Sequence, residues 1–282
     1  MIPLTRLKKE VQFNGELTNV VNVLKGIAAA RFHVLERQLS HFEDFFKVCE
    51  DFLTMVDLRE VDHPFVKPRT EIVGVLMVTS DAGFLGGLNS QVISAGLHAG
   101  QSAGLISVIG ERGTNALRDL RKSFTTFPGI QDATRFPLAL TVRDHLVRQV
   151  LSGQCGRFVV VYPKPISFAV QQVTVESLIP FTAWAQERQV RWSPSRVIWE
   201  SGPPKIVEYV LTQWIGHRLA AIFALSRLAE LAARAVHLEG SYQELTRLGK
   251  RLKLQYFRAK HEIIDRSMRE IFAAQLLYRE KF

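Results

Sequence analysis

Apolar residues recur at steps of three and four along the first part of the chain, a pattern typical of one side of a coiled-coil helix. The series is Leu17, Val21, Leu24, Ala28, Phe32, Leu35, Leu39, Phe42, Phe46, Cys49, Leu53 and Val56. Two consecutive four-residue steps meet at Ala28, which predicts a local irregularity in the supercoil. Gly15 and Gly26 each weaken a helix by about 1 kcal/mol relative to alanine. We therefore expect pairing with another helix to stabilise this segment.

A second helical pattern runs from Lys205 to Phe282, a stretch without proline; ten of the 11 prolines lie between Pro64 and Pro204. Its apolar positions are Val207, Leu211, Trp214, Ile222, Leu225, Ala229, Ala232, Val236, Leu245, Leu248 and Leu252. The first helix leads into the middle of the chain and the second leads out, so the two should pair antiparallel. The second is longer by about 20 residues, so about 30 Å of its tip should extend unpaired. Because a single helix is marginal in water, we expect another protein to surround that tip.

The middle of the chain alternates between apolar runs of strand length and helical patterns, as in α/β domains. Strands are predicted at residues 71–80, 105–109 and 158–162. Helices are predicted from residue 90 onward, at 111–122 and at 138–151. Residues 167–179 alternate between apolar and polar side chains, which indicates an antiparallel edge strand or a hairpin. We predict a small α/β domain between the two long helices.

Charge adds a candidate binding surface on the second helix. The net charge is +9, which favours an anionic partner such as nucleic acid, a membrane surface or an acidic protein. Between Glu244 and Glu262 there is no acidic residue, and the basic residues there are Arg247, Lys250, Arg251, Lys253, Arg258 and Lys260. Since this interval lies on a helix whose tip needs a partner, we interpret it as the contact for an acidic protein surface. No apolar run is long enough to cross a membrane, so we expect a cytosolic chain that reaches a membrane through a partner.

Candidate chemistry is sparse. Cys49 and Cys155 form no CxxC motif and are expected to be buried thiols, and the eight histidines lack the spacing of a zinc site. Gly83, Gly86 and Gly87 follow a predicted strand, but the segment matches neither GxGxxG nor GxxxxGK[ST]. We therefore predict a structural glycine turn, no catalytic residue, no metal and no cofactor. A stand-alone nucleotide-binding α/β enzyme and a basic coiled-coil nucleic-acid binder stay open as alternatives.

Three segments resemble one family. TSDAGFLGGLN at residues 79–89 is similar to the glycine signature of the gamma subunit of F-type ATP synthases, and IAAARF at 27–32 and YFRAKHEIIDRSMREIF at 256–272 are similar to its terminal helices. The resemblance implies an α/β fold class: a long antiparallel coiled coil of N- and C-terminal helices plus a central Rossmann-like α/β domain. The implied domains are residues 1–65 for the N-terminal helix, 66–204 for the Rossmann-like domain and 205–282 for the C-terminal helix.

The resemblance also implies a role and partners. The role is that of a noncatalytic central-stalk rotor, which couples ion movement through a membrane ring to ATP synthesis or hydrolysis. The implied partners are alternating catalytic and noncatalytic subunits around the coiled coil, an epsilon-type stalk subunit and the membrane rotor ring, without nucleic acid, at the cytoplasmic face of the membrane. The expected contacts with the catalytic ring are Arg251, Lys253, Arg258, Lys260, His261 and Asp265. The expected structural turn comprises Asp81, Gly83, Gly86, Gly87 and Asn89.

Overall fold

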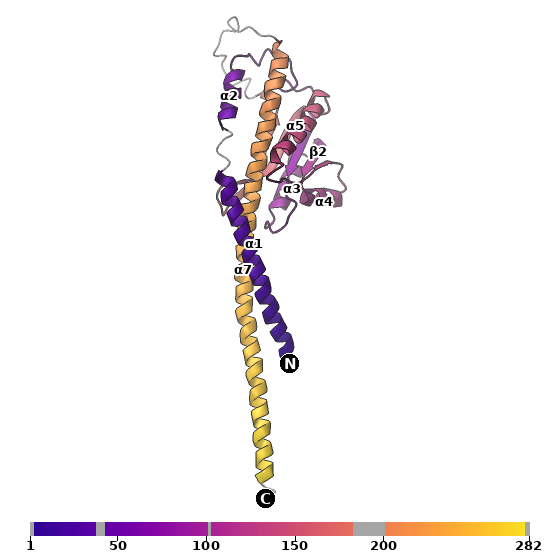
Figure 1. Cartoon of the computed structure of the whole chain (residues 1–282). Coiled ribbons are helices and arrows are strands. Elements are labelled where there is room, and N and C mark those ends of the chain that lie inside the picture. The colour runs from indigo at the N-terminus through magenta and orange to yellow at the C-terminus, as the bar shows by residue number, and fades with distance from the viewer. Residues whose placement is uncertain (1–2, 38–42, 101–102, 183–200, 280–282) are drawn as a thin grey trace. The chain divides into compact units, whose positions relative to one another are not determined.

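The computed structural model describes residues 3–37, 43–100, 103–182 and 201–279 (Figure 1). The chain divides into two compact units. One combines Met1–Ile27 with Ala235–Phe282, and the other is Ala28–Arg234. Two helices, α1 (Leu4–Arg37) and α7 (Pro203–Arg279), contribute to both units.

The larger unit contains a five-stranded sheet in the order β3-β2-β1-β4-β5. Its strands are β1 (Val73–Val78), β2 (Ala103–Ile109), β3 (Thr125–Phe127), β4 (Arg157–Pro165) and β5 (Gln171–Ile179). The pairs among β1 to β4 are parallel, while β5 pairs antiparallel with β4 at the edge. The expected strands and the antiparallel edge are confirmed. Sequence reasoning missed β3, because three residues with two exposed threonines show no usable periodicity.

Helices cover both faces of this sheet, because each parallel strand alternates between two buried faces. On one face α3 (Leu88–Ala99) and α4 (Glu111–Asp119) pack over Val75 and Met77. On the other face α5 (Arg135–Leu151) and α7 pack over Leu76 and Val78, and α2 (Glu43–Leu53) joins the same apolar cluster through its contacts with α7. Both cysteines are free and buried within this unit, as expected.

The helix α7 begins at two prolines, Pro203 and Pro204, which suit the first turn of a helix because their missing N–H groups need no partner there. It then continues through Gly240 and Gly249 to Arg279 without interruption (Figure 1). Between Ile222 and Ala233 nearly every residue is buried. A helix that is buried on nearly every side belongs in a core, and this part of α7 forms the centre of the larger unit.

In the smaller unit α1 and α7 pair antiparallel. Nδ2 of Asn14 donates a hydrogen bond to the carbonyl oxygen of Leu245 at 3.1 Å. Nζ of Lys25 lies 2.9 Å from a carboxylate oxygen of Glu239 and 4.7 Å from the ring centre of Tyr242. As residue numbers rise on α1 they fall on α7, which is the expected antiparallel coiled coil.

The predicted seam on α1 is confirmed at Val21, Ala28, Phe32 and Leu35, which are buried, and is wrong at Leu17 and Leu24. Leu17 and Leu24 are 38% and 40% exposed, whereas Thr18 and Lys25 occupy the partly buried positions beside them. The observed seam is Leu4, Leu7, Val11, Asn14, Thr18, Val21, Lys25, Ala28, Phe32 and Leu35. With Lys25 in the seam, the expected irregularity at Ala28 disappears. The polar members are tolerated because Asn14 and Lys25 find partners on α7. Leu39 and Phe42 of the predicted series lie outside the described residues.

Candidate partner-binding surface and the crevice of the α/β domain

The basic segment, Arg247 to Lys260 of α7, presents all of its charged side chains to solvent. Arg251, Lys253, Arg258, Lys260, His261 and Asp265 are the predicted contacts, and every one of them is exposed. Among the described residues, Arg247 forms an ion pair with Glu244, and Nδ1 of His261 donates to the carbonyl oxygen of Phe257 at 2.9 Å. Within the described part of the chain, no ion pair is formed by the other five charged groups of the predicted set or by Lys250.

The arginines and lysines of the basic segment lie on different faces of the helix. Each residue turns a helix by about 100°, so Arg247, Arg251 and Arg258 share one face. That face points away from the half-buried residues Tyr256 and Ala259 of the coiled-coil seam. Lys253 and Lys260 instead flank the seam. The segment can therefore contact anionic groups on two sides.

The tip of α7 is unpaired over the described residues: every residue from 261 to 274 is exposed. This is the lone extension that the difference in helix lengths predicts. An apolar stripe runs into this exposed tip at steps of seven, four and three. Its members are Phe257, Ile264, Met268 and Ile271, and they are 48–57% exposed. Sequence analysis overlooked this stripe, although its helical spacing is visible in the residues.

The glycine turn after β1 is built from internal hydrogen bonds. Gly86 and Gly87 adopt positive φ angles of 59° and 91°, a region that favours glycine. The Asn89 side chain accepts from the backbone N–H of Ser80 and donates to its hydroxyl oxygen. Oδ1 of Asp81 accepts from the backbone N–H of Glu111 at the start of α4. A methyl group added at Gly83 would lie 3.1 Å from the guanidinium of Arg112.

A crevice lies beyond the carboxyl ends of the parallel strands β1 and β4, where the order of strands in the sheet reverses. Doubly wound α/β sheets bind ligands at this point. In this protein α7 fills the crevice. Only about 10 Å³ of space remains, room for at most one water molecule. Its lining comprises Val78, Thr79, Ser80, Leu85, Leu88, Asn89, Ile130, Pro163, Ser226 and Glu230. The geometry therefore argues against a nucleotide at the glycine turn.

A charged cluster of α7 borders the crevice. Glu230, whose side chain is 9% exposed, receives hydrogen bonds from Arg227 at 2.7 Å and from Arg234 at 2.5 Å. The pKa of Arg227 is raised: burial alone would lower it, but the attraction of Glu230 and Asp132 prevails. All three charges of the α7 cluster are thus paired despite their burial.

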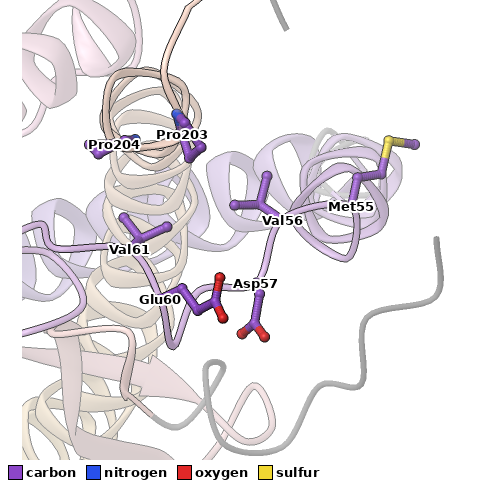
Figure 2. Close-up of a pocket in the computed structure, with 7 residues that line it drawn as sticks. All are labelled: Met55, Val56, Asp57, Glu60, Val61, Pro203 and Pro204. Carbon is purple, nitrogen blue, oxygen red and sulfur yellow. The ribbon is translucent and has the colours of Figure 1, made fainter. Parts of the chain in front are cut away.

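A pocket of about 250 Å³ opens between the start of α7 and the segment after α2. Figure 2 shows Val56 and Val61 between the prolines Pro203 and Pro204 and the carboxylates of Asp57 and Glu60. The lining holds no thiol, hydroxyl or imidazole group. The pKa of Asp57 is lowered, chiefly by the hydrogen bond from Arg59. Among the described residues that line this pocket, the ionisable groups are the carboxylates of Asp57 and Glu60.

Within the described ranges, no three His, Cys, Asp or Glu side chains gather as a metal site would require. In the same ranges, no helix has an apolar stretch that could span a bilayer. The chemically distinctive features are thus the basic segment, the exposed tip and the filled crevice.

Comparison with known proteins gives consistent matches along the chain. The family model described as ATP synthase matches residues 4–275. The ATP synthase gamma chain of Chlorobaculum tepidum is 26% identical over 270 residues, covering 90% of this chain and 91% of that protein. The gamma chain of a Picosynechococcus strain is 21% identical over 306 residues, covering 96% and 98%.

Solved structures show the same fold. The rotor of the Euglena gracilis mitochondrial ATP synthase contains a chain with a TM-score of 0.69 at 15% identity, covering 93% of this chain and 98% of that one. A chain from the central stalk and c-ring of the Tetrahymena thermophila mitochondrial ATP synthase has a TM-score of 0.61 at 15% identity, covering 79% and 99%.

Proposed function

This chain belongs to the ATP synthase family, and we propose that it works there as the noncatalytic central-stalk rotor. In this role it couples ion translocation through a membrane ring to ATP synthesis or hydrolysis in a catalytic ring. Residues 1–65 and 205–282 form the shaft, and residues 66–204 form the α/β domain. The gamma chains that match it over nearly its whole length support this assignment.

The observation that carries the proposal is the exposed tip of α7. A lone helix gains no stability from tertiary packing, and its apolar stripe of Phe257, Ile264, Met268 and Ile271 faces water. Apolar surface of this kind marks a contact with another protein. A helix that is exposed on every side fits a partner that surrounds it, and a ring of subunits is such a partner.

The basic segment supports an acidic lining for that ring. Arg251 and Arg258 point away from the coiled-coil seam, where they can reach a surrounding surface, and arginine pairs with carboxylates through two parallel hydrogen bonds. Lys253 and Lys260 flank the seam and extend the positive surface around the helix. We propose that these four, together with His261 and Asp265, contact the alternating catalytic and noncatalytic subunits.

The remaining partners in the proposal are an epsilon-type stalk subunit and the membrane rotor ring. One similar solved structure is an ATP synthase rotor and another is a central stalk with its c-ring, which supports a position between the catalytic ring and the membrane. We place the chain peripherally at the cytoplasmic face of the membrane. It binds no nucleotide, because α7 fills the crevice of the α/β domain.

The experiment that tests the role of the basic segment is a charge reversal in the assembled complex. Replacing Arg251, Lys253 and Arg258 with glutamate should weaken assembly or ATP-driven ion transport, while circular dichroism of the isolated chain stays unchanged. The matched control reverses Arg121, Lys122 and Lys164, which are exposed on the α/β domain and change the net charge equally. Unchanged coupled ATP synthesis in the first variant would contradict an acidic sleeve around α7.

The same variants address the nucleic-acid alternative. A nucleic-acid binder would show affinity that falls steeply with salt and is lost on reversal of the basic segment. The split of arginines and lysines between two faces does not favour this alternative, because one strand of nucleic acid could not meet both faces. We expect no such binding at physiological salt.

A further inference from the structure

The carboxylate of Glu230 lies in the crevice that ordinarily receives the ligand of a doubly wound α/β domain. It lines the remaining space together with the glycine turn after β1 and the first residues of α3, Leu88 and Asn89. A charge with 9% exposure needs compensating partners, because burying an unpaired carboxylate is costly. Two arginines of the same helix supply them.

The two arginines approach Glu230 from opposite directions along α7. Nη1 of Arg227, three residues before it, donates to Oε2 at 2.7 Å, and Nη2 of Arg234, four residues after it, donates to Oε1 at 2.5 Å. The arginine side chains are themselves only 14% and 17% exposed. One carboxylate therefore fixes the orientation of both guanidinium groups.

Each guanidinium also reaches a different loop of the α/β domain. Nε of Arg234 donates to the carbonyl oxygen of Gly83, in the loop between β1 and α3, at 3.4 Å. Nε of Arg227 lies 3.5 Å from Oδ1 of Asp132, in the loop between β3 and α5. Both loops follow parallel strands, so they lie at the same edge of the sheet. The helix thus contacts that edge at two separate points.

We propose that Glu230 is a positioning residue that locks α7 into the α/β domain, so that the helix and the domain turn as one body. Without its negative charge, two half-buried guanidinium groups would lose their shared partner and repel each other. Both loop contacts would then loosen together. The mechanical consequence rests on the proposed rotor function, because slip at this joint would let ATP hydrolysis proceed with reduced ion transport.

Hydrogen exchange of the isolated full-length chain tests the lock itself. In Glu230→Gln, amides of residues 80–89 and 130–134 should exchange at least about tenfold faster, as expected when charged hydrogen bonds are lost from a local structure. Arg234→Ala should loosen the first loop alone, and Arg227→Ala the second alone. The control Glu244→Gln removes an exposed carboxylate that pairs with Arg247 on the same helix, and it should leave both loops unchanged. Unchanged exchange in Glu230→Gln, or identical patterns in the two arginine variants, would overturn the lock.

Ion transport per ATP hydrolysed, measured in the assembled complex, tests the consequence. Glu230→Gln should lower this ratio while ATP hydrolysis continues, and the control Glu244→Gln should not. If Glu230→Gln does not assemble, the two single arginine variants carry the same measurement. Faster loop exchange with an unchanged ratio would overturn the mechanical role of Glu230 while leaving the rotor function standing. Full coupling in a complex that lacks this chain would instead overturn the rotor function.

Discussion

Gly249 is a helix-interior glycine at which an added methyl group would meet the partner helix. A Cβ atom there would lie 2.7 Å from Nδ2 of Asn14, the atom that donates to the carbonyl oxygen of Leu245. Gly240 lies on the same helix in the same unit, and a Cβ atom there would meet nothing within 4 Å. The two glycines therefore form a matched pair for alanine substitution.

The expected effects have opposite signs. Alanine stabilises a helix interior by about 1 kcal/mol relative to glycine, so Gly240→Ala should raise the free energy of unfolding by about that amount. Gly249→Ala gains the same helix propensity, but its methyl group displaces the side-chain amide of Asn14. Losing the hydrogen bond of that amide costs about 1 kcal/mol, and leaving its donor buried without a partner costs about 1 kcal/mol or more. We expect Gly249→Ala to destabilise the helix pair by about 1 kcal/mol or more.

Removing the obstructing side chain should restore the gain. Asn14→Ala alone loses the hydrogen bond to Leu245, worth about 1 kcal/mol, and removes the buried Oδ1, which has no hydrogen-bond partner among the described residues and so offsets part of that loss. In that background Gly249→Ala should stabilise by about 1 kcal/mol, which gives a coupling energy of about 2 kcal/mol between the two sites.

Urea unfolding followed by far-UV circular dichroism measures these differences. The sequence of the smaller unit, residues 1–27 and 235–282, contains no tryptophan, whereas Trp214 is buried in the larger unit, so tryptophan fluorescence distinguishes the two. Equal stabilisation by alanine at Gly240 and at Gly249 would refute a steric conflict between Asn14 and a side chain at position 249. Additive effects of Asn14→Ala and Gly249→Ala in the double variant would refute it as well.

Other features give four further predictions. Gly110→Ala should lower the unfolding free energy by about 2 kcal/mol or more, because φ is 92° there and a Cβ atom would lie 2.5 Å from a backbone oxygen; chemical denaturation checks this. Cys49 and Cys155 should resist thiol reagents in the folded chain and react after unfolding, because burial raises the pKa of both thiols, to about 11 for the second. The pKa of His217 is lowered by burial, so its neutral form favours folding: stability should fall as pH drops below its ordinary value of 6.5, and His217→Phe should reduce that slope in pH-dependent unfolding. Truncation after Lys260 should leave the unfolding free energy nearly unchanged yet impair assembly, as calorimetry and copurification would show.

The pairing of α1 with α7 shows which features the spacing of apolar residues predicts and which it does not. Its spacing predicts two long antiparallel helices and an unpaired tip, and all of these are present. It does not choose between neighbouring residues at two positions of the seam on α1, Leu17 or Thr18 and Leu24 or Lys25. Leu24 is the more apolar choice, yet Lys25 occupies the seam because Glu239 and Tyr242 receive it. That choice depends on residues more than 200 positions away.

In the α/β domain too, local sequence patterns predicted some features and contacts between distant residues set the others. Apolar runs of strand length and the helical patterns between them predicted its α/β fold class. The spacing of the glycines after β1 already argued against a nucleotide site, because it matches no nucleotide-binding motif. The short strand β3 was not predictable, because its pairing with β2 rather than its own residues makes it a strand.

The sequence by itself thus determined the long helices, the α/β middle and the acid-free stretch of basic residues, because these depend on neighbours along the chain. Only the tertiary structure decided that Thr18 and Lys25 join the seam of α1, that α7 fills the ligand crevice, and that Glu230 joins two arginines bound to separate loops. The physical reason is that each of these depends on desolvation and pairing between groups that only folding brings together.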